Sequence, residues 1–259
     1  MLTLILRCLI VALGLVKSFE CHVVTGVKAL SKTFVSKRWF QSPKVVYALR
    51  EVTVDFAEGI TALCGSSGSG KSTLAKVIHG QYPKEDYQGS VSVVDEAILK
   101  IPTMYLDPFF YLTYDTSKTV GQYLKIHDAQ SVIYKEVYSL FDIPLESVIS
   151  NLFESQRKFF EVLLLFSRMG GLETDDSGLL ILDEYLDKDM SSVRSVFFSK
   201  IRQLCMMENI KFQVIIVTHS NAVCCSCDRV VALKNGIVYS DGAPEKIMKF
   251  LPAEFVLLK

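Results

Sequence analysis

An α/β fold is predicted by three observations. The apolar run Ile60–Cys64 leads into a glycine-rich segment, and the helical pattern Leu74–Ile78 follows it. Two further apolar runs, Leu179–Leu182 and Phe212–Val217, end in polar residues, as strands buried in a parallel sheet do. Of the residues, 50% are hydrophobic and 22% are charged, so the chain can bury a full core.

Composition limits the classes of protein that fit. The chain has 259 residues, a length at which α/β folds often form one domain. Lysine plus arginine equals aspartate plus glutamate, at 28 each, so the net charge gives no reason to expect a nucleic-acid partner. The seven cysteines are an odd number in a long chain, which indicates reduced thiols rather than a disulfide framework.

The first residues, 1–20, are expected to form an apolar leader ahead of one domain at residues 21–259. A short segment ending at Arg7, the apolar Cys8–Val16 and a cleavage position near Ser18 are typical of a signal peptide or targeting segment. The apolar run is shorter than the about 20 residues that span a bilayer. Two other interpretations are an interfacial anchor and an amphipathic helix that lies on a partner.

Residues 21–50 hold six basic side chains and no acidic one. Three interpretations stay open: a solvated face of a sheet, a surface that faces a partner or lipid headgroups, or part of the leader.

The remaining elements follow from periodicity and turn residues. Strands at Val23–Ala29 and Val45–Val54 flank a polar hairpin, Ser36–Lys44, and Gly89–Ile98 alternates like an edge strand. The other expected elements are helices at Val120–Leu124, Val132–Phe141, Asn151–Met169, Val193–Met206 and Pro244–Phe250, a loop with three acids at Gly170–Gly178, and a terminal hairpin of Val230–Leu233 and Ile237–Ser240.

The glycine-rich segment is predicted to bind the phosphates of a nucleoside triphosphate. Its glycines allow successive N–H groups to point at phosphate oxygens, and the following helix adds its positive end. In this context Lys71 is expected to reach the β- and γ-phosphates and Ser72 to hold Mg²⁺. The predicted phosphate site consists of Gly65, Ser66, Ser67, Gly68, Ser69, Gly70, Lys71, Ser72 and Thr73.

Polar residues at the ends of the next two buried strands supply the expected catalytic groups. Asp183 is expected to hold Mg²⁺, and Glu184 to orient or deprotonate the attacking water. His219 ends the following strand, where its ring can approach a γ-phosphate.

The chain resembles the nucleotide-binding domain of ATP-binding cassette (ABC) transporters. The quoted segments are GSSGSGKST, LLILDE, VIIVTHS and CDRVVALKNGIVYSDGAPEKIM, in this order, and the likeness covers about residues 23–250. The resemblance implies an ABC-type P-loop NTPase fold. That fold has a mixed sheet core, an N-terminal antiparallel β subdomain and a helical subdomain at about residues 107–168.

The resemblance also implies an aromatic side chain that stacks on adenine. Phe34 occupies the expected place after the first strand, and Tyr47 is the second candidate. The run Cys224 to Cys227 would lie on the helix after His219, where buried small residues are favoured over a metal site.

Three departures from the family pattern affect function. Leu106 stands where the family has a glutamine that contacts magnesium and water, and Asp107 is the candidate substitute. The family signature LSGGQ is reduced to LFESQ, with Ser155 and Gln156 as its remnant, and Glu154 would repel a γ-phosphate. Either Asp187 or Asp189 is the candidate for the contact between subunits.

The resemblance implies an ATPase subunit of an ABC transporter that uses ATP and Mg²⁺. It would pair with a second ATPase subunit, with the weak signature favouring a heterodimer, and drive a separate transmembrane subunit. No strong small-molecule site besides that for ATP is expected. The alternative is a non-transport ABC ATPase that acts as an ATP switch in assembly or regulation, and a P-loop kinase is disfavoured. The expected location is the surface of a membrane, on a cytoplasmic or organellar, plastid-like face.

Overall fold

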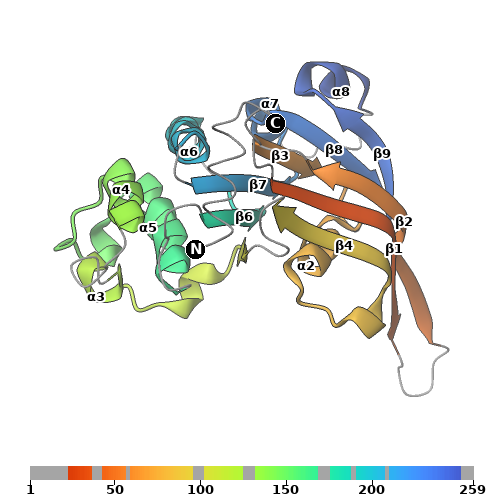
Figure 1. Cartoon of the computed structure of the whole chain (residues 1–259), viewed down its shortest axis with the longest axis horizontal. Coiled ribbons are helices and arrows are strands. Elements are labelled where there is room, and N and C mark those ends of the chain that lie inside the picture. The colour runs from red at the N-terminus through yellow and green to blue at the C-terminus, as the bar shows by residue number, and fades with distance from the viewer. Residues whose placement is uncertain are drawn as a thin grey trace, which may run out of the picture.

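The computed structural model describes most of the predicted ATPase domain (Figure 1). The predicted leader at residues 1–20 and Asp189 lie outside the described residues. No helix in the described part of the chain is long and apolar enough to cross a membrane. The described ranges are 23–36, 43–56, 59–95, 102–124, 132–168, 176–187, 191–207 and 210–251.

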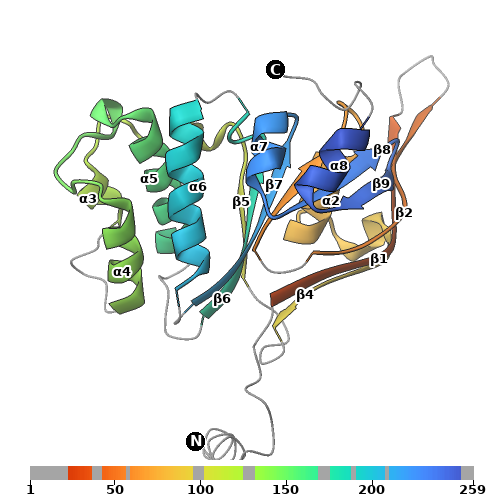
Figure 2. The ribbon, with the colours of Figure 1, turned by 90° about the horizontal axis from the view of Figure 1, so that it is seen from above.

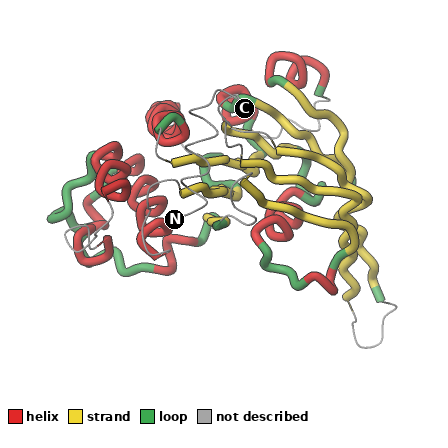
Figure 3. The backbone as a smooth tube through the Cα atoms, in the orientation of Figure 1, coloured by secondary structure: helices red, strands yellow, loops and turns green. Residues whose placement is uncertain are grey.

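The central sheet is mixed, as the resemblance implies. Its six strands follow the order β5-β6-β7-β3-β8-β9, with five parallel strands and β9 antiparallel to β8. Figure 3 shows the strands in yellow and the helices in red around them. Because the carboxyl ends of β3, β6 and β7 meet at one edge, the residues that follow these strands are brought together. The strands are β3 (Gly59–Cys64), β5 (Thr103–Leu106), β6 (Asp176–Asp183), β7 (Ile210–Thr218), β8 (Arg229–Lys234) and β9 (Ile237–Gly242).

A second, antiparallel sheet has the order β2-β1-β4, with β1 at Val23–Ser36, β2 at Lys44–Phe56 and β4 at Gln88–Asp95. The buried side chain of Gln213 on β7 joins it to the central sheet. Its amide donates to the carbonyl of Phe56 and accepts from the Thr25 hydroxyl at 2.5 Å. A buried amide satisfied on both sides fixes the two sheets to each other.

The helices divide into two groups. Figure 2 shows α3, α4 and α5 together at one end of the molecule, with α6 between them and strands β6 and β7. Helix α2 packs on the other side of the central sheet, beside β4. The α-helices are α2 (Lys71–His79), α3 (Val120–Leu124), α4 (Val132–Phe141), α5 (Glu154–Arg168), α6 (Ser191–Cys205), α7 (Asn221–Ser226) and α8 (Pro244–Phe250), and the 3₁₀ turns are η1 (Lys84–Asp86), η2 (Phe110–Thr113) and η4 (Ile149–Asn151).

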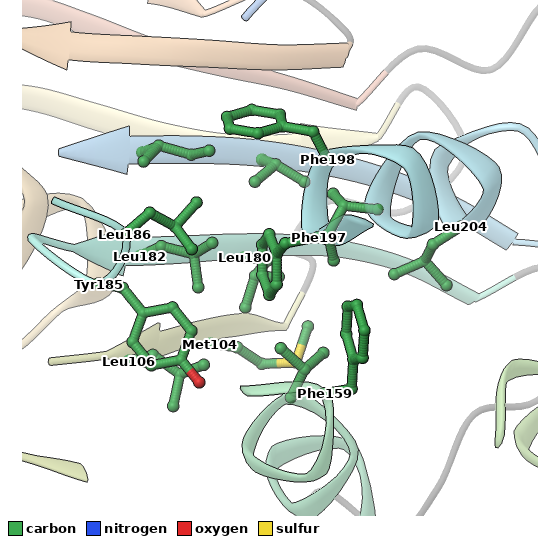
Figure 4. Packing of buried hydrophobic residues seen from close by; sticks show 14 of the residues in the cluster. Met104, Leu106, Phe159, Leu180, Leu182, Tyr185, Leu186, Phe197, Phe198 and Leu204 are labelled. Atoms are coloured by element: carbon green, nitrogen blue, oxygen red, sulfur yellow. The ribbon is translucent and has the colours of Figure 1, made fainter. Parts of the chain in front are cut away.

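Alternate residues of the buried strands divide the core in two. Leu180 and Leu182 of β6 and Leu106 of β5 face the helices α5 and α6. Phe159 of α5 belongs to the same cluster (Figure 4). Their neighbours in the strand face α2 and the antiparallel sheet. Each fully buried leucine or phenylalanine contributes about 1.5–3 kcal/mol to folding. The two clusters hold the central sheet rigidly beneath the site.

Several predicted boundaries are wrong. The first expected strand, Val23–Ala29, is too short, because β1 continues to Ser36 by pairing with β2. Helix α5 begins at Glu154 rather than at residue 151, because Leu152 has extended backbone angles and the Gln156 side chain accepts from the Phe153 N–H. The predicted loop Gly170–Gly178 is wrong for residues 176–178, which belong to β6 because their backbone pairs with β7.

Candidate functional site

The phosphate-binding loop lies between β3 and α2, as predicted. Gly65 has φ +149° and Gly70 has φ +105°, conformations that favour glycine. A Cβ atom at Gly70 would lie 2.4 Å from the carbonyl oxygen of Ala48, and one at Gly65 would lie 2.2 Å from that of Leu233. These two positions therefore have no room for a side chain.

The turn between β8 and β9 supports the loop from outside. The Gly236 N–H donates to the Ser69 carbonyl at 3.0 Å, and the Gly236 carbonyl accepts from the Arg50 N–H at 2.8 Å. Within the loop, Ser69 N–H donates to the Ser66 carbonyl at 3.1 Å. The terminal hairpin and strand β2 thus fix the curvature of the phosphate loop.

Lys71 lies inside the curve of this loop and is only 4% exposed. Its Nζ donates to the carbonyls of Gly65 and Ser66, at 3.0 and 3.1 Å. Burial lowers the pKa of the Lys71 amine, while the neighbouring carboxylates of Glu184 and Asp183 raise it in part. The predicted phosphate-binding lysine and the two predicted carboxylates are thus brought together.

Ser72 and Asp183 meet at the start of α2. The Ser72 hydroxyl donates to Asp183 Oδ1 at 3.1 Å, and the Tyr105 hydroxyl donates to Asp183 Oδ2. Burial raises the pKa of the Asp183 carboxyl, and the two hydroxyl donors lower it in part. Sequence reasoning missed Tyr105, because its contact depends on β5 lying beside β6.

The donor set fits a magnesium ion. A serine hydroxyl and a carboxylate are hard oxygen ligands, and Mg²⁺ in nucleotide sites takes few protein ligands because phosphates and water supply the others. Among the described residues there is no group of three or more histidine, cysteine, aspartate or glutamate side chains that would hold a metal on their own. Ser72 and Asp183 would therefore hold the ion together with bound phosphates.

Glu184 and His219 are in contact at the strand ends. Their Oε1 and Nε2 atoms are 3.1 Å apart, with the Glu184 side chain 44% exposed and that of His219 14% exposed. Glu184 has φ +51°, and its N–H donates to the Val217 carbonyl at 2.9 Å. A left-handed backbone at a non-glycine residue costs about 1–3 kcal/mol and is typical of functional sites.

Asp187 anchors the turn that follows Glu184. Its carboxylate accepts from the His219 N–H at 2.7 Å and from the Thr218 hydroxyl. The sequence names Asp187 as a candidate for a contact between subunits. In the structure its carboxylate binds the neighbouring strand end of the same chain, and the contact between subunits stays a prediction.

Leu106 lies where the resemblance places a glutamine, and it is fully buried (Figure 4). Asp107 follows it, and its carboxylate accepts from the Phe109 N–H at 2.7 Å, as in an Asx turn. The structure gives Asp107 a local role, and its substitution for the glutamine stays a prediction.

The two candidates for adenine stacking lie in different surroundings. Phe34 packs edge-on against Tyr82 at 5.9 Å, with Lys32 Nζ 5.0 Å from its ring centre. Tyr47 is 57% exposed and lines an open surface pocket together with Arg50. Stacking on Phe34 stays a prediction, with Tyr47 as the second candidate.

The signature remnant forms the first turn of α5. Phe153 is 77% exposed, and Glu154 and Ser155 follow it at the helix start. Gln156 Oε1 accepts from the Phe153 N–H at 3.2 Å, which satisfies one of the free donors of the helix end. The remnant therefore stabilises its own helix.

The cysteine run lies on and just after α7, as predicted. Cys224 and Cys227 are buried, which agrees with a packing role. Cys225 is exposed, so the prediction is wrong for this residue, because it lies on the outer face of the short helix.

The structure has the ABC-type P-loop NTPase fold, and the chain resembles the nucleotide-binding domain of ABC transporters. The family model described as "ABC transporter" matches residues 49–136. Two solved ATP-binding cassettes cover 85% and 88% of the chain. One is a dimer of MJ0796 bound to ADP and phosphate, with TM-score 0.60, and the other is MJ1267 in its ADP conformation, with TM-score 0.63. Both are 17% identical to the chain, which shows the fold alone.

Two curated proteins are similar over most of the chain. The xylose import ATP-binding protein XylG of Geobacillus kaustophilus is 24% identical over 240 residues, which are 82% of this chain and 43% of the relative. ABC transporter G family member 23 of Dictyostelium discoideum is 26% identical over 203 residues, or 73% of this chain and 27% of the relative. The chain spans less than half of the length of each.

Proposed function

We propose that the chain binds and hydrolyses ATP as the ATPase subunit of an ABC transporter. The observation that carries the proposal is the meeting of three strand ends. They bring Lys71, Asp183 and Glu184 together, with His219 in contact with Glu184 at 3.1 Å. Phosphate-binding, metal-binding and water-activating groups are then within reach of one bound triphosphate.

Each residue has a defined role in this proposal. Lys71 and the loop N–H groups bind the β- and γ-phosphates and offset their charge. Glu184 orients or deprotonates the attacking water, and His219 donates to the γ-phosphate. A magnesium ion held by Ser72 and Asp183 would neutralise charge that develops on the phosphates.

The proposed partners are a second ATPase subunit and a separate transmembrane subunit. Glu154 places a negative charge in the signature remnant, where it would face the phosphates of the partner's ATP. Asymmetric half-sites favour a heterodimer. A large exposed apolar set follows β5, namely Phe109, Tyr111 and Leu112, and suits a contact with the transmembrane subunit. The chain would thereby lie at a membrane surface, and an organellar face rests on the leader alone.

A second candidate function is that of a non-transport ABC ATPase. It is favoured by Leu106, whose fully buried side chain offers no group to a metal or to water. A chain that couples in another way to its partner would tolerate this residue. Isolation of the complex from detergent extracts separates the two functions, since a multi-span membrane protein is expected only for the transporter.

Phosphate release by the purified chain tests the proposed activity. Glu184→Gln keeps the shape of the side chain and removes its basicity, so we expect ATP binding to persist and turnover to fall by about 10²-fold or more. Equal turnover in both proteins would refute the role of Glu184. Fast, Glu184-dependent turnover by the chain alone would refute the need for a heterodimer.

A further inference from the structure

A buried carboxylate in the middle of α5 has no role in nucleotide binding. Glu161 is 5% exposed, in a helix whose neighbouring residues are almost all apolar. Burying a charged group costs several kcal/mol unless hydrogen bonds compensate. Glu161 receives such bonds from two tyrosines: Tyr114 donates to Oε1 at 2.5 Å, and Tyr185 donates to Oε2. We call Tyr114, Glu161 and Tyr185 the Glu161 junction.

The junction joins three segments that the proposed function uses. Tyr114 ends the segment after β5 that carries the exposed apolar side chains proposed to contact the transmembrane subunit. Glu161 lies two turns into α5, the helix that begins with the signature remnant. Tyr185 directly follows Glu184 in the chain. The Glu161 carboxylate therefore contacts both the segment 107–114, which is proposed to face the transmembrane subunit, and the turn 184–187. We call the turn 184–187 the catalytic turn.

The catalytic turn is held on both sides of Glu184. On the α5 side, Lys158 Nζ donates to the Tyr185 carbonyl at 2.6 Å and lies 4.0 Å from the centre of its ring. On the β7 side, Asp187 binds the Thr218 hydroxyl and the His219 N–H. The left-handed backbone of Glu184 is costly, so it depends on contacts such as these.

An apolar side chain at position 161 would fill the space at a lower desolvation cost. Replacing a buried polar cluster by apolar residues of similar volume is often neutral or stabilising. What the carboxylate adds is direction, since its two oxygens fix two hydroxyl groups and hence the chain segments that carry them. Figure 4 shows the Tyr185 ring among the apolar side chains around Leu106, with its hydroxyl as the polar atom.

We propose that Glu161 and Tyr185 are positioning residues: they hold the backbone of the catalytic turn so that Glu184 faces its water, and they link this geometry to the signature helix and to the segment that ends at Tyr114. The proposal rests on the proposed function. It goes beyond the proposed function because it assigns a role to residues that touch neither ATP nor metal.

A variant with an all-apolar junction distinguishes a positioning role of these residues from a role in packing alone. The triple variant Tyr114→Phe, Glu161→Leu and Tyr185→Phe keeps the rings and the volume and removes every polar group of the junction. We expect its denaturation midpoint to equal or exceed that of the wild type, because the buried carboxylate and both of its hydroxyl donors are removed together. We expect ATP affinity to stay within about threefold and kcat to fall by about tenfold or more, since small misplacement of a catalytic group is costly.

Single variants and a control sharpen the test. Tyr185→Phe alone should reproduce most of the loss in kcat, and Glu161→Gln, which keeps an acceptor, should retain more activity than Glu161→Leu. Glu136→Gln removes the charge of an exposed carboxylate on α4, outside the junction, and should leave kcat unchanged. Wild-type kcat in the triple variant would overturn the proposal.

Hydrogen exchange gives a readout that does not need turnover. The Glu184 N–H is bonded to the Val217 carbonyl and should be protected in the full chain. In the triple variant we expect faster exchange in peptides that cover residues 184–187 and unchanged exchange in β3 peptides. If the wild type hydrolyses no ATP, the proposed function fails, while unchanged exchange at residues 184–187 would overturn the junction separately.

Discussion

At the scale of single residues, Asp183 holds a negative charge where its surroundings oppose it. Burial raises the pKa of its carboxyl, although bonds from Tyr105 and Ser72 act against this. The folded state therefore binds this proton more tightly than the unfolded chain does. The stabilising effect is fully present below the unfolded pKa, near pH 4, and is lost as the pH rises through the folded pKa.

Asp183→Asn should consequently separate stability from function. We expect the variant to melt at a higher temperature than the wild type at pH 7 without nucleotide, because the amide has no charge to desolvate, and the advantage to vanish below about pH 4. Hydrolysis should fall by about 10²-fold or more, since Asp183 is the proposed metal ligand. Thermal unfolding from pH 4 to 8 and phosphate release measure the two effects.

Asp115→Asn is a control of opposite sign. Hydrogen bonds from Ser117 lower the pKa of the exposed Asp115 carboxyl, so its charged form is favoured in the folded state. Its replacement should lower stability at pH 7 and leave hydrolysis unchanged. A lower melting temperature for Asp183→Asn at pH 7 would contradict the assigned cost of burying that charge.

The sequence allows the main site residues to be predicted but not all of their partners. Asp183, Glu184 and His219 each follow an apolar strand, and strand ends of a parallel sheet meet at one edge. The contact of Tyr105 with Asp183 depends on the neighbouring positions of β5 and β6, which no local pattern encodes. The contact of Asp187 with His219 depends on the shape of a turn.

At the scale of elements, the end of β5 determines what the glutamine position can do. None of the surface of Leu106 is accessible, so its side chain reaches neither solvent nor a bound nucleotide. In the register of the sheet it pairs with Leu182 of β6. The first residues of α5 and of β6 differ from the predicted ones. Helix capping by Gln156 and backbone pairing of residues 176–178 decide them, and neither changes the apolar periodicity on which the predictions rest.

Restoring the family residue by Leu106→Gln should therefore destabilise the fold without restoring coupling. The change removes buried apolar surface and places an amide among apolar side chains, at a cost of about 2–5 kcal/mol in the free energy of unfolding. Leu106→Met, of similar volume, should cost less than about 1.5 kcal/mol. Urea unfolding of both variants measures the difference, and a Leu106→Gln protein as stable as the Met variant would show that this strand end can rearrange.

At the scale of the whole molecule, the order of the motifs carried the resemblance from which the architecture was predicted. That resemblance implied the mixed sheet core, the antiparallel β subdomain and the helical subdomain. The link between the helical end and the turn after Glu184 was not predictable, because nothing in the local sequence of α5 distinguishes Glu161 from the other charged residues of that helix. Its partners, Tyr114 and Tyr185, are 47 and 24 residues away in sequence.

The signature remnant leads to the last prediction, on assembly. Glu154 in the first turn of α5 interacts favourably with the positive end of its own helix, yet it would repel the phosphates of a partner's nucleotide. Changing Phe153→Ser, Glu154→Gly and Ser155→Gly restores the family signature. The two glycines should cost up to about 1 kcal/mol each in stability. In a Glu184→Gln background, which preserves bound ATP, we expect these changes to convert a monomer into an ATP-dependent dimer.

Sedimentation or light scattering with and without ATP and Mg²⁺ measures this change in mass. Adding Lys71→Ala, which removes the predicted phosphate-binding ammonium, should return the protein to a monomer. This result would show that the dimer forms around the nucleotide. A dimer of the Glu184→Gln protein with its original signature would contradict the prediction. In that case Phe153, which is 77% exposed, would itself form part of a contact between two copies of the chain, and a homodimer would replace the proposed heterodimer.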